Sequence, residues 1–170
     1  MTNLLRMTLA ASVAALTLTS APAVAAPTSS SNGPATARAR IVKPLTLTRT
    51  SHMDFGDIVV QDAGVATLAM GGALTCSVTL TCAATGTPAA YLVTGTNNQV
   101  VTVTAPDVSL TNAANPGTPL TLDLNAPASI LLPNSGATGE NFSVGGSIAV
   151  AATTRDGLYT GDLAVTVDYQ

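Results

Sequence analysis

The chain has 170 residues, of which 46% are hydrophobic and 9% charged, and its formal net charge at pH 7 is −3. Phosphate binding needs clustered Lys and Arg, so an acidic chain with a single lysine is not expected to bind nucleic acid. The length, the 14 Gly and the 10 Pro fit one turn-rich domain, and with aromatics at 3% its core must consist of Val, Leu, Ile and Ala.

Residues 1–25 have the layout of a secretory signal peptide. Arg6 precedes an apolar run over residues 7–18, and small residues lead to an expected cleavage after Ala25. A polar Pro/Ser/Gly leader is expected over residues 26–36. We therefore expect an exported protein of the periplasm, cell surface or medium. No second long apolar run follows, so we expect no transmembrane segment in the mature chain.

Residues 37–47 alternate with the period of a β-strand, which could be broken at Pro44 because proline favours a sheet edge or a bulge. The residues that share the apolar parity are Ala37, Ala39, Ile41, Leu45 and Leu47. Cations crowd this part of the chain, with Arg38, Arg40 and Lys43 inside the stretch and Arg49 just after it, whereas every acidic residue lies at Asp54 or later. These cations are either solvated side chains or a basic surface that meets the acidic body of a neighbouring subunit.

The middle of the chain reads as short strands separated by turns. Gly56 follows Phe55 and marks an expected kink, and Gly71 with Gly72 marks a turn. The G-T-N-N-Q loop from Gly95 predicts a hairpin between its flanking strands. The expected strands are residues 65–70, 73–80, 90–94, 100–104, 108–110, 120–124 and 129–132.

The strongest pairing signal is the last one. Residues 142–152 alternate, the T-T-R-D-G stretch supplies a turn, and residues 157–170 alternate again, which predicts a C-terminal hairpin. Roughly nine or ten strands and no convincing helix predict an all-β fold, an antiparallel immunoglobulin-like or pilin-like β-sandwich over residues 37–170.

Cys76 and Cys82 are the two cysteines, and in an exported protein a disulfide is the expectation. A straight strand would hold their Cα atoms roughly 20 Å apart, whereas a disulfide needs them within about 7 Å. The strand-like S-V-T-L-T between them must then turn back, as a tight hairpin or bulge. Free or intermolecular thiols are the alternative.

We expect neither an enzyme nor a cofactor or metal site. His52 is the single histidine, and no G-x-S-x-G is present to carry a catalytic serine. Asp123 and Asn125 resemble half of a calcium loop, but the residues that follow supply no further oxygen ligands of the expected kind, so turn capping is the better interpretation.

Several stretches together resemble a family of exported bacterial domains of unknown function. They are M-D-F-G-D-I from Met53, Y-L-V-T-G-T from Tyr91, V-T-V-T-A-P from Val101, F-S-V-G-G-S-I from Phe142 and L-Y-T-G-D-L-A-V-T-V-D-Y from Leu158. More distantly, the D-F-G-x-I element and the terminal strand are similar to the spore-coat-U-like subunits of archaic chaperone–usher pili. The resemblance implies an immunoglobulin-like sandwich and a surface filament subunit.

Two functions follow as expectations. The first is a structural or adhesive cell-surface subunit that assembles by β-strand addition, in which residues 37–47 of one copy pair with another copy. Its partners would be further copies or a periplasmic chaperone, and Arg38, Arg40 and Lys43 would supply the basic contact. The alternative is a monomeric secreted or periplasmic module that binds glycans or envelope components.

Overall fold

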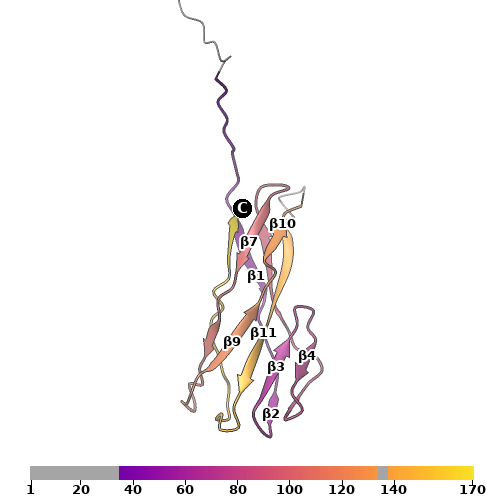
Figure 1. Cartoon of the computed structure of the whole chain (residues 1–170), viewed down its shortest axis with the longest axis vertical. Coiled ribbons are helices and arrows are strands. Elements are labelled where there is room, and N and C mark those ends of the chain that lie inside the picture. Colours follow the sequence, from indigo (N-terminus) through magenta and orange to yellow (C-terminus); the bar gives the residue numbers. More distant parts are fainter. Residues whose placement is uncertain (1–34, 134–137) are drawn as a thin grey trace, which may run out of the picture. The chain divides into compact units, whose positions relative to one another are not determined.

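The computed structural model describes residues 35–133 and 138–170 (Figure 1). The predicted signal peptide and nearly all of the predicted leader lie outside these residues. The chain forms two units, Met1–Ala39 and Arg40–Gln170. In the first, residues 35–39 are exposed and have no regular secondary structure. No helix occurs in the described ranges, and hence none is long and apolar enough to cross a membrane.

The second unit is built of antiparallel strands, as the alternating sequence predicted. In chain order they are β1 (Thr46–Ser51), β2 (Ile58–Val60), β3 (Gly64–Leu68), β4 (Leu74–Cys76), β5 (Leu80–Cys82), β6 (Ala89–Thr94), β7 (Val100–Thr104), β8 (Val108–Leu110), β9 (Leu120–Asn125), β10 (Ser129–Leu131), β11 (Glu140–Val150) and β12 (Thr166–Tyr169). A seven-stranded sheet runs β1-β6-β11-β3-β4, with β9 paired to β11 and β8 to β9. A three-stranded sheet runs β10-β7-β12, and β2 pairs with β5.

The eleven-residue β11 joins the two halves of the large sheet. Its first part, from Glu140 to Val144, pairs with β6, and its second part pairs with β9 and β3. Gly145 and Gly146 stand where the pairing changes. A Cβ on Gly146 would lie 2.7 Å from the Asp123 carbonyl oxygen of β9, and one on Gly145 would overlap the Leu68 carbonyl oxygen. Glycine is therefore required here by the close approach of two neighbouring strands.

Apolar side chains gather in two core clusters. The first lies between β6 and β11 on one side and β7 and β10 on the other, and it contains Ala89, Tyr91, Val93, Val101, Val103, Ile130, Leu132, Phe142 and Val144. The second consists of Ala66, Leu80, Val108, Leu110, Leu122, Ile148 and Val150. β11 contributes to both clusters. Aliphatic side chains dominate them, as the scarcity of aromatic residues predicted, and Tyr91 stacks on Phe142 with ring centroids 5.5 Å apart.

Both predicted hairpins are wrong. β11 and β12 do not pair, because β11 already has β6, β9 and β3 as neighbours, and β12 pairs with β7 in the other sheet. β6 lies between β1 and β11, so β7 likewise joins the other sheet. The predicted G-T-N-N-Q loop does contain a left-handed residue, Asn98 at φ 54°, but it connects two sheets.

The predicted strand over residues 37–47 is also too long. Residues 40–45 have no strand assignment, and β1 begins at Thr46, two residues after Pro44. The proline removes a backbone donor, and β1 is an edge strand, as expected of a strand that follows proline. Ile41 is 92% exposed, so the apolar residues before Pro44 are not buried in their own chain, whereas Leu45 and Leu47 are half-buried.

Candidate functional site

Several strands lie at sheet edges, and two of them, β1 and β12, come from the first and last parts of the folded unit's sequence. Among the described strands, β1 pairs with β6 alone and β12 with β7 alone. Each therefore presents a row of backbone N–H and C=O groups on its far side, which is the usual template for pairing with another strand. Figure 1 shows the end of β12 beside the chain that leads into β1.

The apolar side chains of these two strands and of the residues that lead into them are half-buried. We call them the edge strip: Leu45, Leu47, Leu163, Val165, Val167 and Tyr169, all packed against the first core cluster. The alternation predicted for the C-terminal stretch is confirmed from Leu163 onward, since Ala164, Thr166 and Asp168 are exposed, but the strand itself begins only at Thr166 and not near Gly157. Whereas Val93 and Val101 of the central strands are 0% exposed, every member of the edge strip keeps part of its surface in water. The edge strip therefore packs as part of the hydrophobic core, but the described part of the chain leaves some of its apolar surface exposed.

One end of the edge strip is closed by the Tyr169 hydroxyl. It donates a hydrogen bond to the Lys43 carbonyl oxygen at 2.6 Å and accepts one from the Thr96 backbone N–H at 2.7 Å. The Lys43 N–H in turn donates to Thr96 Oγ1 at 2.6 Å. Gly95 fits beneath this network because a Cβ there would lie 2.6 Å from the Tyr169 hydroxyl and 2.8 Å from Leu45. The chain before β1 is thereby fixed to the end of β12.

The other end opens into a cavity of about 130 Å³, which we call the edge hollow. Its lining comes from the end of β1 and the residues after it, from β6, and from the stretch before β12: Arg49, Ser51, His52, Met53, Ala89, Tyr91, Gly161, Asp162 and Leu163. Burial raises the pKa of Tyr91, and the nearby Arg49 guanidinium acts in the opposite direction. The volume is below the roughly 300–1,000 Å³ of small-molecule sites, and it suits a single side chain.

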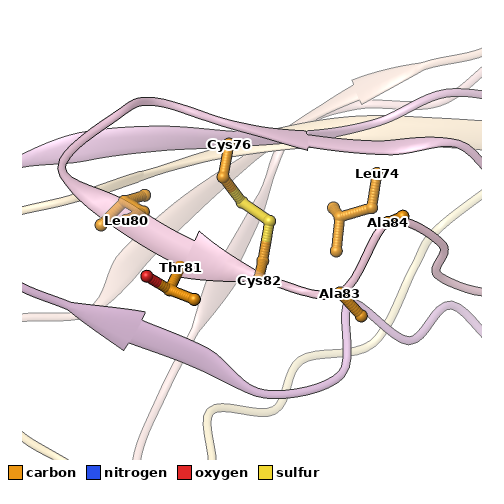
Figure 2. A pocket seen from close by; sticks show the side chains of 7 residues that line it. All are labelled: Leu74, Cys76, Leu80, Thr81, Cys82, Ala83 and Ala84. Carbon is orange, nitrogen blue, oxygen red and sulfur yellow. A yellow bond between two sulfur atoms is a disulfide. The ribbon is translucent and has the colours of Figure 1, made fainter.

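A second hollow, of about 310 Å³, lies beside the disulfide (Figure 2). It is lined by Leu74, Cys76, Leu80, Thr81, Cys82, Ala83 and Ala84. None of these residues carries a titratable side chain, because both cysteines are bonded. The arrangement offers no acid, base or charged ligand group for chemistry.

The disulfide between Cys76 and Cys82 is confirmed, with a Cα–Cα distance of 6.4 Å. The chain turns back at Ser77, whose carbonyl oxygen accepts from the Leu80 N–H at 2.8 Å. Residues that favour strands tolerate this turn because they form hydrogen bonds with a neighbouring strand. Ser77 Oγ, for example, accepts a hydrogen bond from the Val65 N–H of β3 at 2.9 Å. The two cysteines belong to β4 and β5, which lie in different sheets, so the bridge is not part of a hairpin.

The predicted contact residues separate into two groups. Ala37, Arg38, Ala39, Arg40 and Ile41 are exposed and lie outside any strand, whereas Leu45 and Leu47 belong to the edge strip. Lys43 is exposed but fixed through its backbone.

The residues weighed for chemistry are dispersed. His52 lines the edge hollow. Asp123 lies inside β9 and not in a loop, so the turn-capping interpretation is wrong for it, and Asn125 is the last residue of β9. Over residues 35–133 and 138–170, no three His, Cys, Asp or Glu side chains come together as a metal site would need. The sequence interpretation missed the hydroxyl network of Tyr169, although its apolar parity with Val167 was visible.

Comparison with known proteins identifies the family and no individual relative. No curated protein and no solved structure matches the chain. A model of the family described as a domain of unknown function, DUF4402, matches residues 45–169. This range runs from Leu45, just before β1, to Tyr169, the last residue of β12. The chain belongs to the DUF4402 family.

Proposed function

We propose that this chain is an exported structural or adhesive cell-surface subunit that assembles by β-strand addition. In this proposal residues 37–42 of one copy, the donor segment, lie along the edge strip of the next copy. We also interpret the two layers around the first core cluster as an immunoglobulin-like sandwich that lacks a strand between β1 and β12. The observation that carries the proposal is the edge strip itself.

The donor segment and the edge strip have complementary patterns. Ala37, Ala39 and Ile41 alternate with Arg38 and Arg40, so one face of an extended segment is apolar and the other is charged. The strip offers half-buried apolar side chains and two unpaired backbone edges. Strand addition would satisfy these edges with main-chain hydrogen bonds and cover the strip, which is how strand-adding partners gain affinity.

The length of the donor segment is set by Lys43. Its backbone N–H and C=O are both bonded within its own chain, to Thr96 and Tyr169. Residues 35–42 are exposed and lie outside the matched domain, which begins at residue 45. A copy can therefore lend residues up to Val42 while its own β1 stays in place.

Deleting residues 26–42 from the exported chain tests the proposal. We expect the chain that begins at Ala26 to form large species in sedimentation and filaments in electron micrographs. We expect the deleted chain to stay folded and monomeric, because Lys43 and β1 remain. A deleted chain that still assembles would rule out strand addition, and a full exported chain that stays monomeric at every concentration would reject the subunit role.

The second hypothesis from the sequence, a module that binds glycans or envelope components, gains no comparable support. The larger hollow lies at the lower limit of ligand-site volumes and holds no charged side chain. Binding of such a ligand by a strictly monomeric chain would be the result that favours this module.

A further inference from the structure

From the edge hollow we infer which residues fix the position of the donor segment. Ile41 of a second copy occupies the edge hollow, and Arg40 of that copy lies beside Asp162. This inference rests on the proposed function and adds to it the register and direction of the added strand.

The edge hollow is suited to an aliphatic side chain. Met53, Ala89, Tyr91 and Leu163 form its apolar wall, and all four also belong to the first core cluster or pack against it. Arg49, His52 and Asp162 are exposed and form a polar rim. A cavity with an apolar wall and a wet rim favours a strand whose inward side chain is apolar and whose next side chain is charged.

Among the residues of the donor segment, Ile41 is the best candidate to fill the edge hollow. It is 92% exposed in its own chain, and it is the largest side chain on the apolar parity of the segment. Ala37 and Ala39 share that parity but are too small to fill the hollow. Val42, the neighbouring aliphatic residue, falls on the opposite face of an extended strand.

The closed end of the edge strip determines the direction. Tyr169, Lys43 and Thr96 block that end, so a donor segment attached to its own folded unit must enter at the edge hollow. Its N-terminal residues then point toward Tyr169, antiparallel to β12. In this orientation Ile41 falls opposite Gly161 and Ala39 opposite Leu163, both in the stretch that leads into β12. Residues 36 and 35 then fall opposite Thr166 and Val167 of β12 itself.

The same register places the donor Arg40 opposite Asp162. Both side chains are exposed, and neither forms an ion pair with another described residue of its own chain. Arg49 stands on the β1 side of the rim and would repel a second cation, so Arg40 is directed toward the β12 side. An exposed ion pair of this kind determines the register of the added strand more than it increases the affinity between the two copies.

Charge exchange tests the pair. Arg40→Glu and Asp162→Arg should each weaken assembly by about three- to tenfold at low salt, and the double variant should restore it, because the pair is exposed and contributes modestly. The effect should shrink at high salt. Asp168→Arg, an exposed position of the same parity within β12, is the matched control and should not rescue Arg40→Glu.

A second measurement locates Ile41 directly. Replacing Ile41 with a diazirine analogue of leucine should give cross-links to Met53, Tyr91 or Leu163 of another copy, whereas the same probe at Val42 should not. Assembly with cross-links elsewhere and no charge rescue would overturn this register and leave strand addition standing. Absence of assembly in the unmodified exported chain would overturn both the register and the proposed function.

Discussion

Removing one oxygen atom, by Tyr169→Phe, should loosen the closed end of the edge strip. The hydroxyl serves two backbone groups, the Lys43 carbonyl oxygen at 2.6 Å and the Thr96 N–H at 2.7 Å. Lys43 is exposed, so water can replace its partner, whereas Thr96 is half-buried. An unsatisfied buried amide costs about 1–3 kcal/mol, so the lower half of that range, about 1–2 kcal/mol, is expected here.

A loss of this size should lower the melting temperature by roughly 3–8 °C in a domain of this length. Thermal unfolding followed by circular dichroism measures it, and hydrogen exchange should show faster exchange of the Thr96 amide. Tyr159→Phe is the matched control, because the Tyr159 hydroxyl donates only to the exposed Arg155 carbonyl oxygen at 3.0 Å, and should cost less than about 0.5 kcal/mol. Equal melting temperatures for the two variants would refute the reasoning.

Three further predictions concern the folded unit. Gly146→Ala should lower the free energy of unfolding by at least about 2 kcal/mol in a denaturant titration, because its Cβ has no room beside β9, whereas Gly71→Ala, with nothing within 4 Å, should be nearly neutral. Replacing Cys76 and Cys82 together by Ser should cost about 2 kcal/mol, the loop-closure value for a separation of 6 residues, and an unchanged urea midpoint would contradict this. Because burial raises the folded-state pKa of Tyr91, the contribution of Tyr91 to the free energy of unfolding should be complete below its unfolded pKa near 10 and should be lost as the pH rises through the folded pKa. Tyr91→Phe should flatten this alkaline decline in stability, and an unchanged pH profile of stability would contradict the assignment to Tyr91.

The position of strands could be predicted from the sequence more fully than their partners. Val101 and Val103 are buried as their alternation indicates, and Leu163, Val165 and Val167 face the core on the predicted parity. Alternation reports which side chains face the core, and it carries no information about which strand lies alongside. The β11–β12 hairpin failed for that reason, since three strands already occupy the edges of β11.

The candidate site was predictable in part. The alternation of Ala39 and Ile41 and that of the C-terminal stretch could be expected from local pattern alone, but the exposure of Ala39 and Ile41 could not. The contact of Tyr169 with Lys43 joins residues 126 positions apart, so no local pattern contains it. Likewise, the edge hollow exists because the stretch before β12 and the end of β1 lie at the margins of two different sheets.

The pairing of β11 has a consequence for the order in which the molecule can fold. Strands β3, β6 and β9 are all synthesised before β11, and each pairs with it. Until residue 150 has been made, these strands lack a main partner, so both core clusters stay incomplete. Such long-range pairing makes folding slow and leaves strand edges open to wrong contacts meanwhile. Folding therefore has to wait for the last quarter of the chain, and a ribosome-bound fragment that stops before Glu140 should remain susceptible to proteases along its whole length.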